Sequence, residues 1–145
     1  MSFFKSMKIS SAGLSAQRLR MNVLSSNLAN AQSTRTEEGG PYKRKDVVFS
    51  AVGVDGTFSD FLDSTMETQL KKPQVVDIHE DTKSPRTVFD PSHPDANEEG
   101  IVELPNIQVM NEMVNMITAT RAYEANATAL NESKQMAMKA LEIGR

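Results

Sequence analysis

Apolar side chains recur every seven residues along the last third of the chain, between residues 106 and 143. Two interleaved rows have this spacing, and most of their positions are apolar. The rows are Val109, Met116, Tyr123, Leu130 and Ala137, and Met113, Thr120, Ala127, Lys134 and Leu141. No proline interrupts the segment, which is rich in residues that favour helix. The pattern predicts one helix of roughly 37 residues, about 55 Å long, that packs along its length.

A second apolar face lies beside these rows. Its members are Met110, Val114 and Ile117. Near the C-terminal end of the segment, Met136, Met138 and Ile143 add further apolar positions outside the two rows. A helix that is apolar on more than one side has to be buried on more than one side. Methionine suits surfaces that adapt to several partners. We therefore interpret the segment as an assembly helix, with a helix of an ordinary bundle as the alternative.

A second helical pattern covers residues 7–31. One stripe consists of Met7, Leu14, Met21 and Leu28 with Leu24 and Ala31, and a neighbouring stripe of Ala12, Ala16, Leu19 and Val23. We expect the first stripe to pack antiparallel against the C-terminal helix. The second stripe then stays exposed on the monomer and has to be covered by neighbouring molecules.

The segment between the helices loses this periodicity. Residues 32–45 are predicted to form a loop because Gly39, Gly40 and Pro41 break any helix, and the basic run at 43–45 is expected to be a solvated surface. Residues rich in β-favouring side chains predict short strands, at 46–54, 74–78 and 86–89. The run 58–66 has helical spacing but suits a short loop-packed segment equally well.

The predicted fold is mainly α, with two long terminal helices packed antiparallel as a coiled-coil-like pair. We expect residues 1–35 and 103–145 to form a terminal helical assembly domain. Residues 36–102 are expected to form a small β-rich or extended insertion between the two helices.

The polar segment 90–100 is the one place where side chains suggest a metal or catalytic site. Its carboxylates and His93 are candidate ligands, but their spacing does not fit a calcium loop, and His79 is the only other histidine. Prolines and Asx side chains explain the segment as a rigid turn. We therefore expect no catalytic residue, no metal and no cofactor in this protein.

Composition and charge exclude several further classes of function and location. A chain of 145 residues with a formal charge of −3 gives no reason to expect nucleic acid, and the absence of cysteine excludes disulfides and cysteine chemistry. No apolar run approaches the ~18 residues that cross a bilayer. Residues 1–8 lack the long apolar core of an ordinary signal peptide. We expect the protein to stay in the cytoplasm or to leave it by a route that reads no such peptide.

Several motifs resemble the bacterial flagellar rod and hook family, and in particular its basal-body rod branch of the FlgC type. They lie at 17–22, 26–30, 39–44, 90–96, 100–102, 105–106, 112–116 and 121–126, in collinear order over nearly the whole chain. The motif residues that we single out are Asn27, Asn30, Gly39, Gly40, Pro41, Tyr42, Asp90, Pro91, His93, Pro94 and Asp95. The family more often has aspartate in place of Asn97 and tyrosine in place of Ile101.

The resemblance implies a structural subunit of the proximal rod, the helical drive shaft that carries motor torque across the periplasm. It also implies export through the flagellar type III secretion apparatus without a cleaved signal peptide. In this family the N- and C-terminal helices pair antiparallel and line a hollow shaft, with the β-rich middle outside. The expected partners are copies of the same chain, other rod proteins and, in transit, the export apparatus.

The residues expected to form the assembly interface are the large members of the helical stripes. They are Leu14, Met21, Leu24, Leu28, Val109, Met113, Met116, Ile117, Tyr123, Leu130 and Leu141. A head-to-tail contact that repeats without closing generates a helical filament. The alternative function is a soluble helical adaptor or secretion chaperone, which would use the same stripes on a single client.

Overall fold

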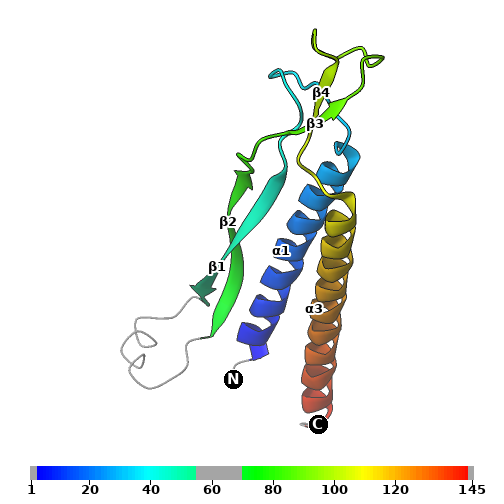
Figure 1. Cartoon of the computed structure of the whole chain (residues 1–145). Coiled ribbons are helices and arrows are strands. Elements are labelled where there is room, and N and C mark those ends of the chain that lie inside the picture. Colours follow the sequence, from blue (N-terminus) through cyan, green and yellow to red (C-terminus); the bar gives the residue numbers. More distant parts are fainter. Residues whose placement is uncertain (1–2, 55–69, 144–145) are drawn as a thin grey trace.

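The computed structural model describes residues 3–54 and 70–143, which form two long helices and two small sheets (Figure 1). In chain order the elements are α1 (Phe3–Ala29), β1 (Lys45–Gly53), β2 (Lys71–Glu80), β3 (Arg86–Phe89), β4 (Ile101–Leu104) and α3 (Val109–Ile143). The predicted segment 58–66 lies outside the described residues. None of the described helices is long and apolar enough to span a membrane.

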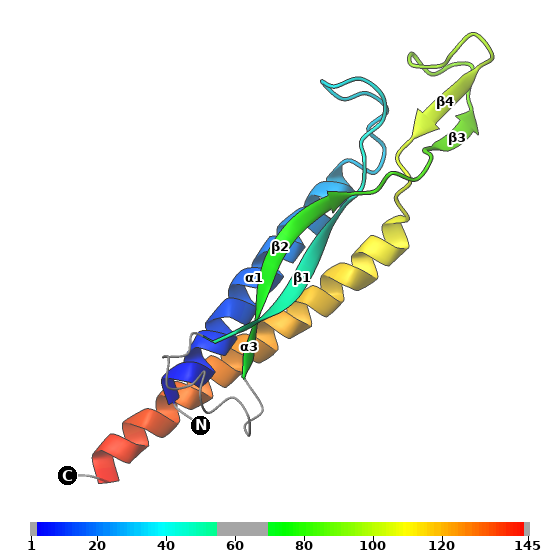
Figure 2. The same cartoon turned by 90° about the vertical axis from the view of Figure 1, so that its left-hand side faces the viewer.

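The two helices run antiparallel, as predicted. Along α1 the contacts pass from Gly13 through Met21 to Asn27, while their partners on α3 descend from Asn126 through Thr120 to Glu112. Figure 1 shows α1 and α3 side by side over most of their length. In Figure 2, α3 continues past the beginning of α1. The paired arrangement is thus confirmed, and the C-terminal turns of α3 project beyond it.

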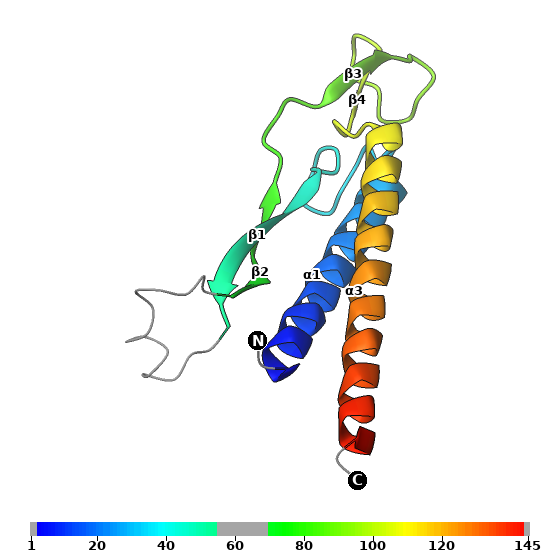
Figure 3. The same ribbon diagram turned by 90° about the horizontal axis from the view of Figure 1, so that it is seen from below.

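The β1–β2 hairpin lies along the side of α1 that faces away from α3 (Figure 3). The strands are antiparallel with Val47 opposite Ile78, and a bulge between Val48 and Phe49 interrupts the register. The guanidinium of Arg20 on α1 lies 6.0 Å from the centre of the Phe49 ring. Helix α1 is therefore enclosed between α3 and the hairpin.

This position of the hairpin corrects one expectation. The second stripe of α1 was expected to stay exposed on the monomer, but Ala16 and Val23 are buried and Ala12 and Leu19 are half-buried. The insertion is long enough to fold back along the helix, so it covers the stripe within the same chain. Of the two helices, as far as the structure describes them, α3 alone keeps a second apolar face uncovered.

The second sheet pairs β3 with β4, with Arg86 opposite Leu104 and Phe89 opposite Ile101. It lies beyond the end of the helix pair where α1 finishes and α3 begins (Figure 2). Strand β3 has the predicted bounds, whereas β4 was not predicted. Four residues interrupted by Glu103 give too short a pattern to identify a strand without its partner.

The rows of α3 that face α1 differ in part from the predicted rows. The buried residues Glu112, Ala119 and Ser133 share one seven-residue row. The predicted residues Met116, Tyr123, Leu130 and Ala137 are half-buried beside that row, but Val109, Met113, Thr120, Lys134 and Leu141 are exposed. The period was predicted correctly, and Thr120 does lie at the edge of the seam, 3.6 Å from the Met21 sulfur on α1. Placing the other four exposed positions in the seam was wrong. Hydrophobicity selects large apolar side chains, whereas the observed contact line of α3 consists of small or polar ones.

Candidate functional site

The best-buried polar side chains of the described chain are Asn27 on α1 and Glu112 on α3, at 0% and 2% exposure. The Asn27 amide nitrogen donates to the Lys45 carbonyl at 2.7 Å and to Oε2 of Glu112 at 3.2 Å. Its carbonyl oxygen accepts the Lys45 amide at 2.9 Å and the Tyr42 hydroxyl at 3.2 Å. Every donor and acceptor position of this buried amide is therefore satisfied.

Arg44 supplies the charge that balances Glu112. Its Nε lies 2.7 Å from Oε1 of Glu112, and its Nη1 lies 3.3 Å from the exposed carboxylate of Asp46. Burial acts to lower the pKa of Arg44, but the hydrogen bonds and charges of Glu112 and Asp46 outweigh it and raise the pKa. The guanidinium therefore stays charged at any physiological pH.

This ion pair corrects the prediction that residues 43–45 form a solvated basic run. Lys43 is exposed, but Arg44 and Lys45 are half-buried. We call Asn27, Tyr42, Arg44, Lys45 and Glu112 the polar junction. It joins both helices to the beginning of β1, and the Asp81 amide extends it to the end of β2 by donating to the Arg44 carbonyl at 2.7 Å.

Two of the predicted motif residues, Asn27 and Tyr42, belong to the polar junction. Sequence reasoning did not assign Arg44 and Glu112 a role there, although both stand inside motifs that carry the resemblance. The heptad spacing could have indicated that Glu112 is buried, because Glu112 shares a seven-residue row with Ala119 and Ser133, and this row faces the partner helix. A carboxylate at such a position needs a buried cationic partner.

The remaining motif residues build the loops beyond the helix pair. Asn30 caps the end of α1 by donating from its side chain to the Ser26 carbonyl at 2.9 Å. Gly39 and Gly40 adopt positive φ angles of 85° and 77° next to Pro41, which explains the glycines there. The hydroxyl of Thr34 donates to Asp95 at 2.7 Å and ties this loop to the segment 90–100.

The segment 90–100 is the connection between β3 and β4. Asp90 accepts hydrogen bonds from both the amide and the hydroxyl of Ser92, which hold its pKa below the usual range. The His93 ring accepts the Asp95 amide at 3.1 Å. These contacts are local to the turn, as predicted, and Pro91 and Pro94 stand exposed within it. Among the described residues no cluster of three or more His, Asp or Glu side chains could hold a metal ion.

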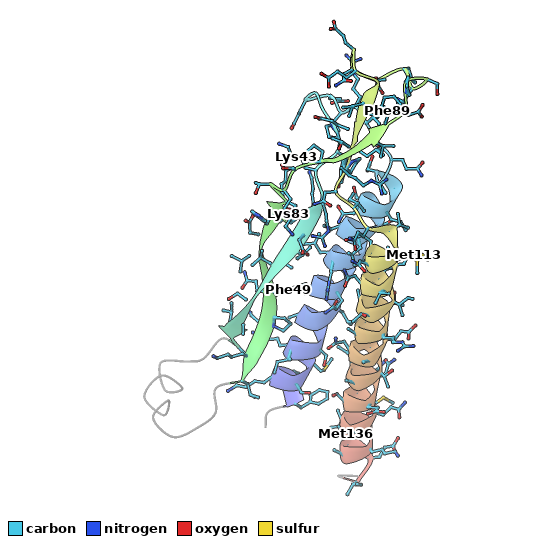
Figure 4. All side chains as sticks on the ribbon, viewed as in Figure 1. Lys43, Phe49, Lys83, Phe89, Met113 and Met136 are labelled. Atoms are coloured by element: carbon cyan, nitrogen blue, oxygen red, sulfur yellow. The ribbon has the colours of Figure 1, made fainter. Side chains whose placement is uncertain are left out.

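The uncovered surface of the helix pair is the outer side of α3. Met110, Val114 and Ile117 are 73%, 59% and 54% exposed, and Met113 beside them is 46% exposed. The spacing places these four side chains on adjacent turns of one face. We call them the α3 patch. A second exposed apolar group lies near the C-terminal end of α3 and contains Met136, Met138, Leu141 and Ile143. Figure 4 labels one residue of each group: Met113 in the α3 patch and Met136 in the second group.

The other predicted interface residues take part in contacts within the chain. Leu24 is buried, and Leu14, Met21 and Leu28 on the same helix are half-buried. The Thr120 hydroxyl lies 3.6 Å from the Met21 sulfur across the helix pair. The predicted interface residues of α1 are thus buried or half-buried, and those of α3 divide between the inside and the outer surface.

Comparison with known proteins matches both halves of this architecture. Residues 7–35 match the family model described as flagella basal body rod protein. Residues 98–143 match the model described as flagellar basal body rod FlgEFG protein C-terminal. The two matches cover the two paired helices and leave out the hairpin.

Whole-chain relatives agree with these matches. The chain is 45% identical to the flagellar basal-body rod protein FlgC of Bacillus subtilis over 100% of both chains. It is 41% identical to that of Borreliella burgdorferi, over 99% of this chain and 98% of the relative. Identity to the Escherichia coli O157:H7 protein is 36%, over 94% of each chain. The chain therefore belongs to the flagellar basal-body rod protein family, in its FlgC branch, and is a structural subunit of the flagellar rod.

Proposed function

We propose that this subunit joins the proximal rod through the outer side of α3, and that its neighbours there are further rod subunits. The observation that supports this is the unequal covering of the two helices. Helix α1 is enclosed by α3 and the hairpin, whereas α3 presents the α3 patch to solvent. A row of large apolar side chains at helical spacing is a docking face for another helix.

The proposed assembly domain consists of residues 1–35 and 103–145, with the insertion 36–102 directed away from the shaft axis. The predicted interface residues then fall into two groups. Leu14, Met21, Leu24 and Leu28 hold the helix pair together, with Met116, Tyr123 and Leu130 opposite them. Val109, Met113, Ile117 and Leu141 contact neighbouring subunits.

The site of action is the part of the rod inside the periplasmic space, reached through the flagellar type III export apparatus without a cleaved signal peptide. An elongated molecule with a helix pair as its main body suits a torque-bearing shaft, because many lateral contacts share the load and no chemical step is needed. Repetition of a heterologous contact between such subunits gives a helical rather than a closed assembly.

The test is a charge placed within the α3 patch. Val114→Glu and Ile117→Glu should leave the subunit folded, because both side chains are more than half exposed, but should abolish rod assembly by placing a carboxylate in an apolar contact. Ser15→Glu is the matched control, since it adds the same charge at an exposed position of α1.

The measurements are swimming of cells whose own copy is replaced by each variant, and electron microscopy of their isolated basal bodies. Circular dichroism of the purified variants checks the fold. Normal swimming and complete rods with Val114→Glu and Ile117→Glu would exclude the α3 patch as an assembly contact.

A further inference from the structure

We infer that the polar junction fixes the axial register of the helix pair, so that α1 and α3 pair in one of several arrangements that apolar packing alone would allow. This goes beyond the rod function, because it concerns how a single chain selects its own fold.

The contact rows of the helix pair repeat every seven residues. On α3 the inner row contains Glu112, Ala119, Asn126 and Ser133, and the neighbouring row contains Met116, Tyr123, Leu130 and Ala137. A slip of seven residues moves one helix past the other by about 10 Å and brings another member of the same row to each position. The repeating pattern therefore does not by itself distinguish one register from the next.

The close approach of Gly13 to α3 does not distinguish the registers either. A Cβ atom at Gly13 would lie 2.7 Å from Oδ1 of Asn126, so a larger residue at position 13 would have to displace the asparagine side chain. After a slip of one heptad, Gly13 would face Ala119 or Ser133, and both side chains are smaller than asparagine. Gly13 tolerates all three neighbours.

The polar junction does distinguish the registers. In the observed register the Glu112 carboxylate meets the Asn27 amide at 3.2 Å and Arg44 Nε at 2.7 Å. A slipped helix would separate Glu112 from both groups and leave the charge unpaired, which is strongly unfavourable for a buried carboxylate. A single buried polar group is known to select register in this way in coiled coils.

The hairpin is held by the same residues. Both hydrogen bonds between Asn27 and the Lys45 backbone fix the beginning of β1 on α1, while Arg44 reaches over to α3. One register therefore sets the position of the hairpin relative to the α3 patch. A subunit in a slipped register would present these two surfaces about 10 Å out of place.

The register can be read by cross-linking, because the chain has no cysteine of its own. The reference pair is Met21→Cys with Thr120→Cys, since these side chains are in contact at 3.6 Å. The two slipped registers are probed by Met21→Cys with Met113→Cys and by Met21→Cys with Ala127→Cys. Each purified full-length variant is oxidised at low concentration, and peptide mapping gives the yield of the intrachain disulfide.

The three cysteine pairs are compared in four backgrounds: the unaltered chain, Glu112→Ala, the double variant Arg44→Met with Glu112→Met, and Glu80→Gln. The double variant replaces the ion pair with apolar side chains of similar length. Glu80→Gln is the control, because it removes the partner of Lys45 from an exposed ion pair of 3.3 Å.

In the unaltered chain and in Glu80→Gln we expect only the reference pair to form the disulfide efficiently. In Glu112→Ala and in the double variant the ratio of slipped to reference disulfide should rise at least about tenfold, which corresponds to about 1.4 kcal/mol. The inference is overturned if both variants stay helical and cross-link only through the reference pair. Loss of helix in both variants would also overturn it, because the pair would then be needed for folding rather than for register.

This readout is independent of rod assembly. Cross-links within one chain form whether or not the α3 patch contacts a neighbour, so the proposed function can fail while the register inference holds, and the reverse is also true.

Discussion

The Asn27 amide nitrogen donates a hydrogen bond of 3.2 Å to Oε2 of Glu112, and these two residues are 85 positions apart in the chain. The bond crosses the antiparallel helix pair at the end where the insertion leaves α1 and returns to α3. Neither residue is exposed to water by more than 2%. A polar contact therefore lies among the best-buried residues of the described structure, while the apolar side chains of the α3 patch face outward.

Replacing Asn27 with alanine should destabilise the protein by about 2–4 kcal/mol, because it leaves the part-buried Lys45 backbone groups without their Asn27 partner and removes one hydrogen bond from the buried Glu112. Urea unfolding followed by circular dichroism measures the change. Asn30→Ala is the control, since Asn30 makes one exposed bond to the Ser26 carbonyl and its loss should cost below about 1 kcal/mol. Equal effects of the two changes would contradict the importance of the polar junction.

Arg44→Met should cost about 3 kcal/mol, because it leaves the Glu112 carboxylate buried without a cation. The neighbouring change Lys43→Met removes the same charge from an exposed side chain and should alter the free energy of unfolding by no more than about 0.5 kcal/mol. Both are measured by denaturant titration of the purified variants. A small effect at Arg44 would mean that Glu112 finds another partner.

Gly13→Ala combines two opposing effects. Alanine favours helix by about 1 kcal/mol, but its Cβ would approach the Asn126 side chain to 2.7 Å, and that side chain is bonded to the Ala122 carbonyl at 2.8 Å. We therefore expect Gly13→Ala to be neutral or destabilising alone but stabilising by about 1 kcal/mol in an Asn126→Ala background. A double-mutant cycle on thermal unfolding measures this coupling, and additive effects would exclude a direct contact.

Gly100→Ala should disrupt the β3–β4 connection. Gly100 has a φ of 74°, and a Cβ would lie 3.0 Å from the Pro91 ring and 3.1 Å from the Phe89 ring. Gly39→Ala is the matched comparison, because its φ of 85° imposes a similar backbone strain but no atom lies within 4 Å of the added Cβ. We expect a cost of about 1–2 kcal/mol at position 39 and a larger one at position 100. Denaturant unfolding of the two purified variants measures both costs, and equal costs at positions 39 and 100 would argue against the crowding at Gly100.

The sequence alone determined the helical architecture of this protein. Long segments with seven-residue apolar periodicity and without proline have few alternatives to helix, and two of them at opposite ends of one chain can pair antiparallel through a compact insertion. The turn at 90–100 was equally predictable, because proline, glycine and Asx residues restrict the backbone locally. The collinear motifs were sufficient to indicate the family.

Only the tertiary structure decided which apolar faces are covered. The stripes of α1 and α3 look alike in sequence, but the hairpin folds along α1 and leaves α3 uncovered, and that choice depends on contacts between residues far apart in the chain. The same is true of Arg44 and Glu112. A cation in a loop and a carboxylate on a helix are usually solvated, and burial makes them a pair only after the fold brings them to 2.7 Å.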